Sequence, residues 1–239
     1  MVTGTCLSPY NKSGMNDYFY GMLRQLFFLF WHCKLLDLKN IPRQGPAVFV
    51  SNHLGSFAPV AFLSAYPGRL YPWVEHQVTD WKLCSEYLRK DFIEPELHLK
   101  PPLSHFLGWL ISLPCVMLMK AIEAVPVCQK SMKLVSTWKR SIELLKKDQS
   151  LAIFPENDSL PFNEVMNELD DGFIGLAPIY YEKTGRILSF IPVAVHKTVK
   201  AIKIGRPISY NPKNAFSSER ERIKAALQAD ITEMYPSFR

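Results

Sequence analysis

The sequence has no Cys-x-x-Cys pair, and its cysteines are an odd number spread along the chain: Cys6, Cys33, Cys84, Cys115 and Cys128. We therefore expect neither a cysteine-based metal site nor a disulfide scaffold, and reduced thiols suit a protein that faces the cytosol. The first residues lack a positively charged start followed by an apolar core, so no cleavable signal peptide is expected. No groove-reading or base-stacking motif is present, which argues against a nucleic-acid partner.

The composition predicts one sizeable folded core. The chain has 239 residues, of which 48% are hydrophobic and 21% are charged. Its net charge of +6 suits an anionic membrane or an acidic small molecule such as an acyl carrier. Aromatic residues make up 13% of the chain, and many of them lie in two apolar tracts. This distribution favours contact with lipid.

The first apolar tract covers residues 18–38. Arg24 and Lys34 interrupt it, so its uncharged centre is shorter than the roughly 20 residues that a membrane-spanning helix needs. Its aromatic cluster is flanked by basic residues, which predicts an amphipathic helix lying in the membrane interface. A buried core helix is the alternative. We expect residues 1–38 to form this interface segment and residues 39–239 to form a single domain.

The second apolar tract contains no charged residue between Pro101 and Met119. This composition resembles that of a membrane-spanning segment, although Gly108 and Pro114 interrupt the tract. Insertion into the membrane, a helix lying in the interface and an ordinary buried helix all remain open.

Alternating elements between and after these tracts predict an α/β fold with a mixed central sheet flanked by helices. Turn residues precede a short apolar strand over 47–50, which delivers Asn52 and His53 at its carboxyl end, where ligands bind in open α/β sheets. Further strands are expected over 124–129, before Pro155 and over 187–195. Amphipathic helices are expected over 131–147 and after Ser217.

Six short motifs occur in a specific order along residues 40 to 210. They are SNH (51–53), an apolar Gly-Trp tract around 108–109, VPV (125–127), FPE (154–156), GFIGLA (172–177) and IPVAV (191–195). In this order and spacing they resemble the glycerolipid (lysophospholipid) acyltransferase family, and especially its 1-acylglycerol-3-phosphate acyltransferases. The resemblance implies an acyltransferase-like fold.

The resemblance also implies an activity in phospholipid biosynthesis. Such enzymes transfer a fatty acyl group from acyl-CoA or acyl carrier protein to a hydroxyl of a glycerolipid, with these carriers as substrates and no further cofactor or metal. A protein of this kind would be associated with the cytoplasmic side of a membrane. His53 matches the general base, a role that suits imidazole with its unperturbed pKa of about 6.5. Glu156 matches a second catalytic residue, and the expected substrate-binding residues are Asn52, Phe154, Pro155, Asn157, Asp158 and Gln129.

The sequence departs from the family pattern at three places. In the family, four residues separate the histidine from an aspartate. The corresponding position in this chain is Ala58, so its His-x4-Asp motif is degenerate. Gln129 and the segment 157–159 stand where the family has phosphate-binding arginines. Either another carboxylate, Glu156 or Asp158, orients His53, or the chain is a catalytically impaired relative that binds lipid or acyl chains.

Overall fold

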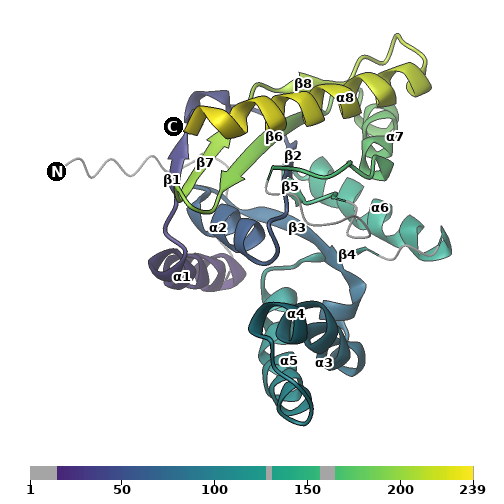
Figure 1. Ribbon diagram of the computed structural model, residues 1–239. Coiled ribbons are helices and arrows are strands. Elements are labelled where there is room, and N and C mark those ends of the chain that lie inside the picture. The colour runs from purple at the N-terminus through teal and green to yellow at the C-terminus, as the bar shows by residue number, and fades with distance from the viewer. Residues whose placement is uncertain (1–14, 128–130, 157–164, 239) are drawn as a thin grey trace. The chain divides into compact units, whose positions relative to one another are not determined.

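The computed structural model describes residues 15–127, 131–156 and 165–238 (Figure 1). The chain packs into two compact units. One unit comprises Met1–Leu70 and Ser141–Arg239, and the other comprises Tyr71–Arg140. The division into a membrane-interface segment (residues 1–38) and a single domain (residues 39–239) stays a prediction.

The first unit contains a mixed β-sheet. Its strands are β1 (Lys34–Leu36), β2 (Ala47–Ser51), β5 (Ser150–Ile153), β6 (Ser189–His196), β7 (Ala201–Ile204) and β8 (Ile208–Ser209). They are ordered β1-β7-β6-β2-β5, with β8 also paired to β6. Strand β2 runs parallel to β5 and β6, whereas β6 runs antiparallel to β7 and β8. The predicted mixed sheet is confirmed.

Helices cover both faces of this sheet, as the sequence predicted. The helices of the unit are α1 (Met15–Phe30), α2 (Phe57–Ala65), α7 (Leu176–Thr184) and α8 (Phe216–Met234), with 3-10 turns η1 (Leu38–Asn40), η4 (Gly172–Gly175) and η5 (Tyr235–Phe238). On one face, the Phe49 ring of β2 packs against Phe62 of α2 and against Tyr66, which follows that helix. On the other face, Phe190 of β6 packs against Phe173 of η4, and α8 packs on β6.

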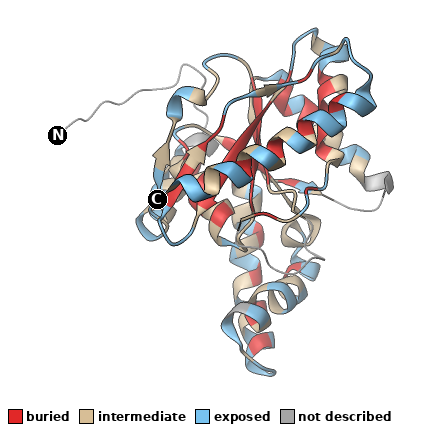
Figure 2. Ribbon diagram, turned by 45° about the horizontal axis from the view of Figure 1, so that its top comes forward, coloured by how far each residue is buried: buried red, intermediate tan, exposed pale blue. Residues whose placement is uncertain are grey.

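Strand β2 lies at the centre of this core. All five of its residues are buried, which is typical of a parallel strand covered on both faces (Figure 2). Phe49 is in register with Ala152 of β5 on one side and with Ile191 of β6 on the other. Because these three strands are parallel, their carboxyl ends lie at the same edge of the sheet. The residues that follow β2 and β5 therefore meet there.

The second unit contains a smaller parallel pair, β3 (Leu70–Glu75) with β4 (Val125–Val127), which begins in the first unit with Leu70. Its helical elements are η2 (His76–Thr79), α3 (Trp81–Leu88), the π-helical turn η3 (Arg89–Ile93), α4 (Glu94–Leu97) and α5 (Leu103–Ala121). Helix α6 (Ser131–Lys146) passes from this unit into the first after Arg140. The sequence predicted β4, α6 and α8 but did not resolve the helices α3 and α4.

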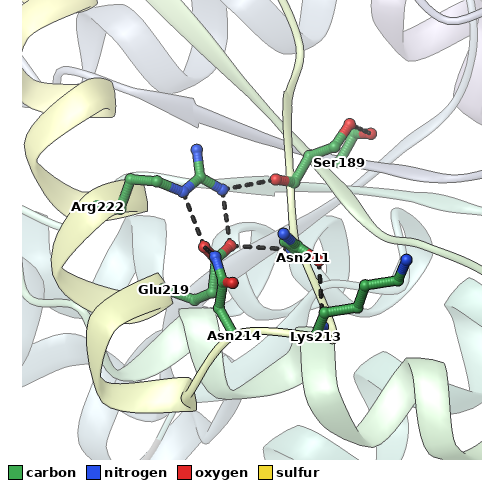
Figure 3. Close-up of polar contacts among 7 residues, drawn as sticks. Ser189, Asn211, Lys213, Asn214, Glu219 and Arg222 are labelled. Atoms are coloured by element: carbon green, nitrogen blue, oxygen red, sulfur yellow. Dashed lines mark hydrogen bonds and ion pairs between the residues drawn. The ribbon is translucent and has the colours of Figure 1, made fainter.

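A buried carboxylate closes the first turn of α8 (Figure 3). The side chain of Glu219 is 1% exposed, and its oxygens accept hydrogen bonds from the main-chain N–H of Asn211, the amide of Asn214 and the guanidinium of Arg222. Arg222 also donates to the main-chain oxygen of Ser209. The bonds from Arg222, followed by those from Asn214 and Asn211, lower the pKa of Glu219 to about 2.

This carboxylate should make the fold sensitive to acid. Its pKa in the folded chain lies below the unfolded value of about 4.3, so its stabilising contribution is complete above that value and is lost as pH falls toward 2. The shift corresponds to about 3 kcal/mol of unfolding free energy. Glu219→Gln should lower stability at neutral pH by about that amount and flatten the pH dependence between about pH 4.5 and 2. Denaturant unfolding across this pH range measures both effects.

The control is Glu221→Gln, at an exposed acid in the same helix. It removes the same charge without touching the network and should leave the acid response unchanged. If the Glu219→Gln variant loses as much stability in acid as the parent does, other carboxylates cause the acid response.

Candidate active site

A tight turn after β2 places His53 at the edge of the sheet. The strand ends at Ser51, and the chain turns at Leu54 and Gly55, whose φ angles are 46° and 61°. The left-handed conformation costs a residue other than glycine about 1–2 kcal/mol, so Leu54 is held there by its surroundings. Helix α2 then begins at Phe57. His53 is thus a half-buried residue between a central strand and a helix.

Asn52 fastens this turn to the neighbouring strand. Its side chain is fully buried, its amide nitrogen donates to the main-chain oxygen of Val195 at 3.0 Å, and its amide oxygen accepts from the N–H of the same residue at 2.8 Å. Both polar atoms of the side chain are therefore engaged with β6. Asn52 fixes the position of His53 relative to the sheet, whereas substrate contact by Asn52 stays a prediction.

Glu156 fastens the same turn from the other side. Its carboxylate accepts the main-chain N–H of His53 at 2.6 Å through one oxygen and the main-chain N–H of Asn167 at 3.3 Å through the other. Glu156 also forms an isolated antiparallel bridge with Leu169. One carboxylate thus joins the turn after β2, the segment after β5 and the residues near 167. The family resemblance pointed to Glu156, and the structure places it directly against the backbone of His53.

Phe154 contacts the imidazole ring itself. The two ring centroids are 5.9 Å apart, and the planes meet at 87°, an edge-to-face arrangement. The main-chain oxygen of Pro155 accepts a hydrogen bond from the N–H of Asp170. The structure therefore brings His53, Phe154 and Glu156 together, with Pro155 anchoring the segment. The other predicted site residues, Asn157, Asp158 and Gln129, lie outside the described residues.

Ala58 occupies an apolar environment. It is the second residue of α2, is 0% exposed and belongs to the buried cluster that includes Phe49 and Phe62. Alanine provides no charge or hydrogen-bonding group at the position where the resembling family carries its aspartate. The methyl group of Ala58 therefore contributes to the core and not to the polar site.

Lys197 is a basic residue near this site that was not among the predicted site residues. The ammonium of Lys197, which follows β6, lies 5.9 Å from the centre of the Phe57 ring at the start of α2. Nothing in the linear sequence indicates that Lys197 approaches the turn after β2. Among the described residues, no group of three or more His, Cys, Asp or Glu side chains is placed to hold a metal.

Comparison with known proteins gives a likeness of fold. No protein-family model and no curated protein match the sequence. The structure is similar to the crystal structure of the 1-acyl-sn-glycerophosphate (LPA) acyltransferase PlsC from Thermotoga maritima. The TM-score is 0.57 at 14% sequence identity, and the match covers 92% of this chain and 80% of that one. The chain therefore has an acyltransferase-like fold.

Proposed function

We propose that this protein transfers a fatty acyl group from acyl-CoA or acyl carrier protein to a hydroxyl of a glycerolipid or a related acceptor. The observation that carries the proposal is the position of His53, held at the carboxyl edge of an acyltransferase-like sheet by Glu156 and Asn52. Ligands bind at this edge in open α/β sheets. The reaction belongs to phospholipid biosynthesis and needs no cofactor besides the acyl carrier, which is a substrate.

In the proposed reaction, the imidazole of His53 is the general base. It removes the proton from the acceptor hydroxyl as the oxygen attacks the thioester carbonyl. The tetrahedral intermediate collapses, the carbon–sulfur bond breaks, and the protonated imidazole returns the proton to the leaving thiolate. The products are an ester and a free thiol. Glu156 acts as a positioning residue, because its bond to the His53 N–H fixes the backbone that carries the base.

A second candidate function is binding of lipid or acyl chains without transfer. The buried, apolar setting of Ala58 favours it, because no carboxylate at that position orients the imidazole. In a serine protease, disabling the equivalent partner of the histidine lowers the rate by about 10⁴-fold. The two candidates differ in turnover and share ligand binding.

Helix α1 supports association with a membrane. Arg24 donates to the main-chain oxygen of Tyr66, and Tyr20 is buried, so this side of α1 faces the protein. The opposite side exposes large apolar side chains at helical spacing: Tyr18, Met22, Leu26, Leu29 and Phe30. Such a stripe suits a helix lying in a lipid interface. We propose that the protein associates with a membrane through this stripe, on the cytoplasmic side and in contact with its lipid acceptor.

The proposal is tested by incubating purified protein with labelled acyl-CoA and acyl carrier protein and a panel of lysolipids and alcohols. Transfer to at least one glycerolipid acceptor is expected. Binding of lysolipid or acyl-CoA without transfer to any member of the panel would establish the binding function instead.

Restoring a carboxylate at position 58 distinguishes the two candidates further. In Ala58→Asp, we expect a several-fold rise in turnover, because a carboxylate is disfavoured in the apolar core and gains by turning toward the His53 imidazolium, which it then stabilises. Pairing makes the imidazole more basic, so the acidic limb of the pH–rate profile should move to higher pH. The start of α2 also favours a negative charge. Turnover, the pH–rate profile and the melting temperature are the measurements.

The matched control is Ala58→Asn, which has nearly the same shape without the charge. It should show the same loss of packing but neither the gain in turnover nor the pH shift. A folded Ala58→Asp variant with a shifted titration of His53 and no transfer would support the lipid-binding function.

A further inference from the structure

Helix α5 carries its large apolar side chains on the outside. Six of them are at least half exposed: Leu103 54%, Phe106 59%, Trp109 67%, Leu110 50%, Leu113 61% and Met117 62%. They form a stripe along the helix with spacings of three and four residues, which we call the α5 stripe. The helix has 19 residues, so it is about 28 Å long.

The buried side of α5 is made of small residues. Ser104, Gly108, Ser112 and Val116, spaced four apart, are its buried positions. A methyl group on Gly108 would lie 2.8 Å from the main-chain oxygen of Ser85 in α3, so the two helices approach too closely for any side chain there. The proximity of Cys115 in α5, together with burial, also raises the pKa of the Cys84 thiol in α3. These contacts fill the inner side of α5 without its large apolar residues.

This arrangement is the reverse of that of a surface helix in water, which turns its large apolar residues inward. Helices that contact lipid pack on each other through small residues and direct large apolar side chains toward the acyl chains. The helix is also apolar enough to pass as a membrane span by length and composition, with only 22% of its apolar window buried. Its surface therefore matches a hydrocarbon environment.

The charges around the α5 stripe favour an anionic lipid surface. No acidic residue occurs between Glu96 and Glu123. The exposed ionisable residues of this stretch are Lys100 just before the helix, Lys120 in its last turn, and the histidines His98 and His105. Lysines at both ends of an apolar helix can bind the headgroups of anionic lipids while the stripe enters the acyl region.

Helix α3 limits how deeply α5 can enter. Glu86 of α3 and Lys90 of η3 form an ion pair at 2.7 Å with both side chains more than half exposed, and Lys82 of α3 is also exposed. Charged groups are costly inside a bilayer. Because α3 packs directly on α5, the two helices cannot both enter the hydrocarbon region of the bilayer. This arrangement favours α5 lying along the interface over a helix that crosses the membrane.

From these observations we infer that the α5 stripe is a second membrane-docking surface, which lies in the plane of an anionic lipid bilayer. It is separate in sequence from the stripe of α1. The inference extends the proposed membrane association and does not depend on acyl transfer, because vesicle binding measures it directly.

The test is flotation of the full chain with vesicles of phosphatidylcholine, with and without an equal part of phosphatidylglycerol. The double variant Leu113→Gln/Met117→Gln should bind anionic vesicles at least about 10-fold more weakly than the parent, since it removes two exposed apolar side chains from the interface. Brominated lipid should quench parent fluorescence more strongly than that of Trp109→Phe, because Trp109 lies in the α5 stripe. Unchanged binding and unchanged quenching would overturn the inference.

The matched control is Ile187→Gln/Val199→Gln, which makes the same type of change at two exposed apolar positions outside both stripes and should bind like the parent. Leu26→Gln/Leu29→Gln reports on α1. If only this α1 variant loses vesicle binding, docking is confined to α1 and the inference for α5 is overturned. A smaller solution mass of the α5 variant, with unchanged vesicle binding, would identify the stripe as a contact between copies of the chain, which also overturns it. Transfer to detergent-dispersed acceptor tests the proposed activity separately.

Discussion

Replacement of His53 with alanine is expected to lower acyl transfer by at least about 10²-fold, the scale on which a positioned general base contributes. The substitution removes the imidazole but keeps the main-chain N–H that Glu156 binds. The substitution also removes the edge-to-face contact with Phe154. A ring contact of this kind contributes about 1 kcal/mol, so a loss of stability on that scale is expected. Initial rates and thermal melts of the two proteins measure these effects.

Chemical rescue makes this result specific to the base. Added imidazole should restore part of the activity of His53→Ala, because it can occupy the space of the missing ring and accept the same proton. His98→Ala, at an exposed histidine in the other unit, serves as the control and should retain full activity. Full activity in His53→Ala would assign the chemistry to another group.

Replacement of Asn52 with leucine should produce the largest loss of stability. Leucine fills a similar volume but leaves both the N–H and the oxygen of Val195 buried without the partners that Asn52 provides. Each buried group left without a hydrogen bond costs about 1–3 kcal/mol, so a loss of roughly 2–6 kcal/mol is expected. Activity should fall as well, since the turn carrying His53 loses its attachment to β6. Denaturant unfolding and initial rates are the measurements.

The variant Asn52→Asp tests the same contact through pH. Its carboxylate can still accept the N–H of Val195 but meets the carbonyl oxygen with an unprotonated oxygen at neutral pH. Burial raises the pKa of such an aspartate, and the protonated form can donate to that carbonyl. The stability deficit of Asn52→Asp should therefore shrink as pH falls toward 5. Ser64→Ala removes a buried hydroxyl that donates to the main-chain oxygen of Ala61 in its own helix, and it should cost less than about 1 kcal/mol at any pH.

The strands and long helices could be predicted from the sequence because their patterns are local. The run Ala47 to Val50 is apolar throughout, as a strand covered on both faces requires, and the spacing of Ile223, Leu227 and Ile231 marks the buried side of α8. The short helix α4, with four residues, has too few positions for any periodicity to show.

The candidate site was predictable in its residues but not in its connections. His53 and Glu156 could be selected from their motifs, whereas the bond from Glu156 to a main-chain N–H leaves no trace in a linear sequence. The reversed pattern of α5 also could not be read in advance. An apolar tract identifies a helix that avoids water, but only the packing shows that Gly108 faces α3 and Trp109 faces outward.

The two attachments of the His53 turn have a consequence for synthesis on the ribosome. Glu156 follows His53 by 103 residues, and Val195 follows Asn52 by 143. The motif that carries the histidine therefore emerges early but has neither attachment until most of the chain has been translated. Closing such long loops costs entropy that is recovered only when the partners meet. The candidate site is accordingly among the last parts of the nascent protein to form, and a chain interrupted before Val195 carries the histidine motif without its second attachment.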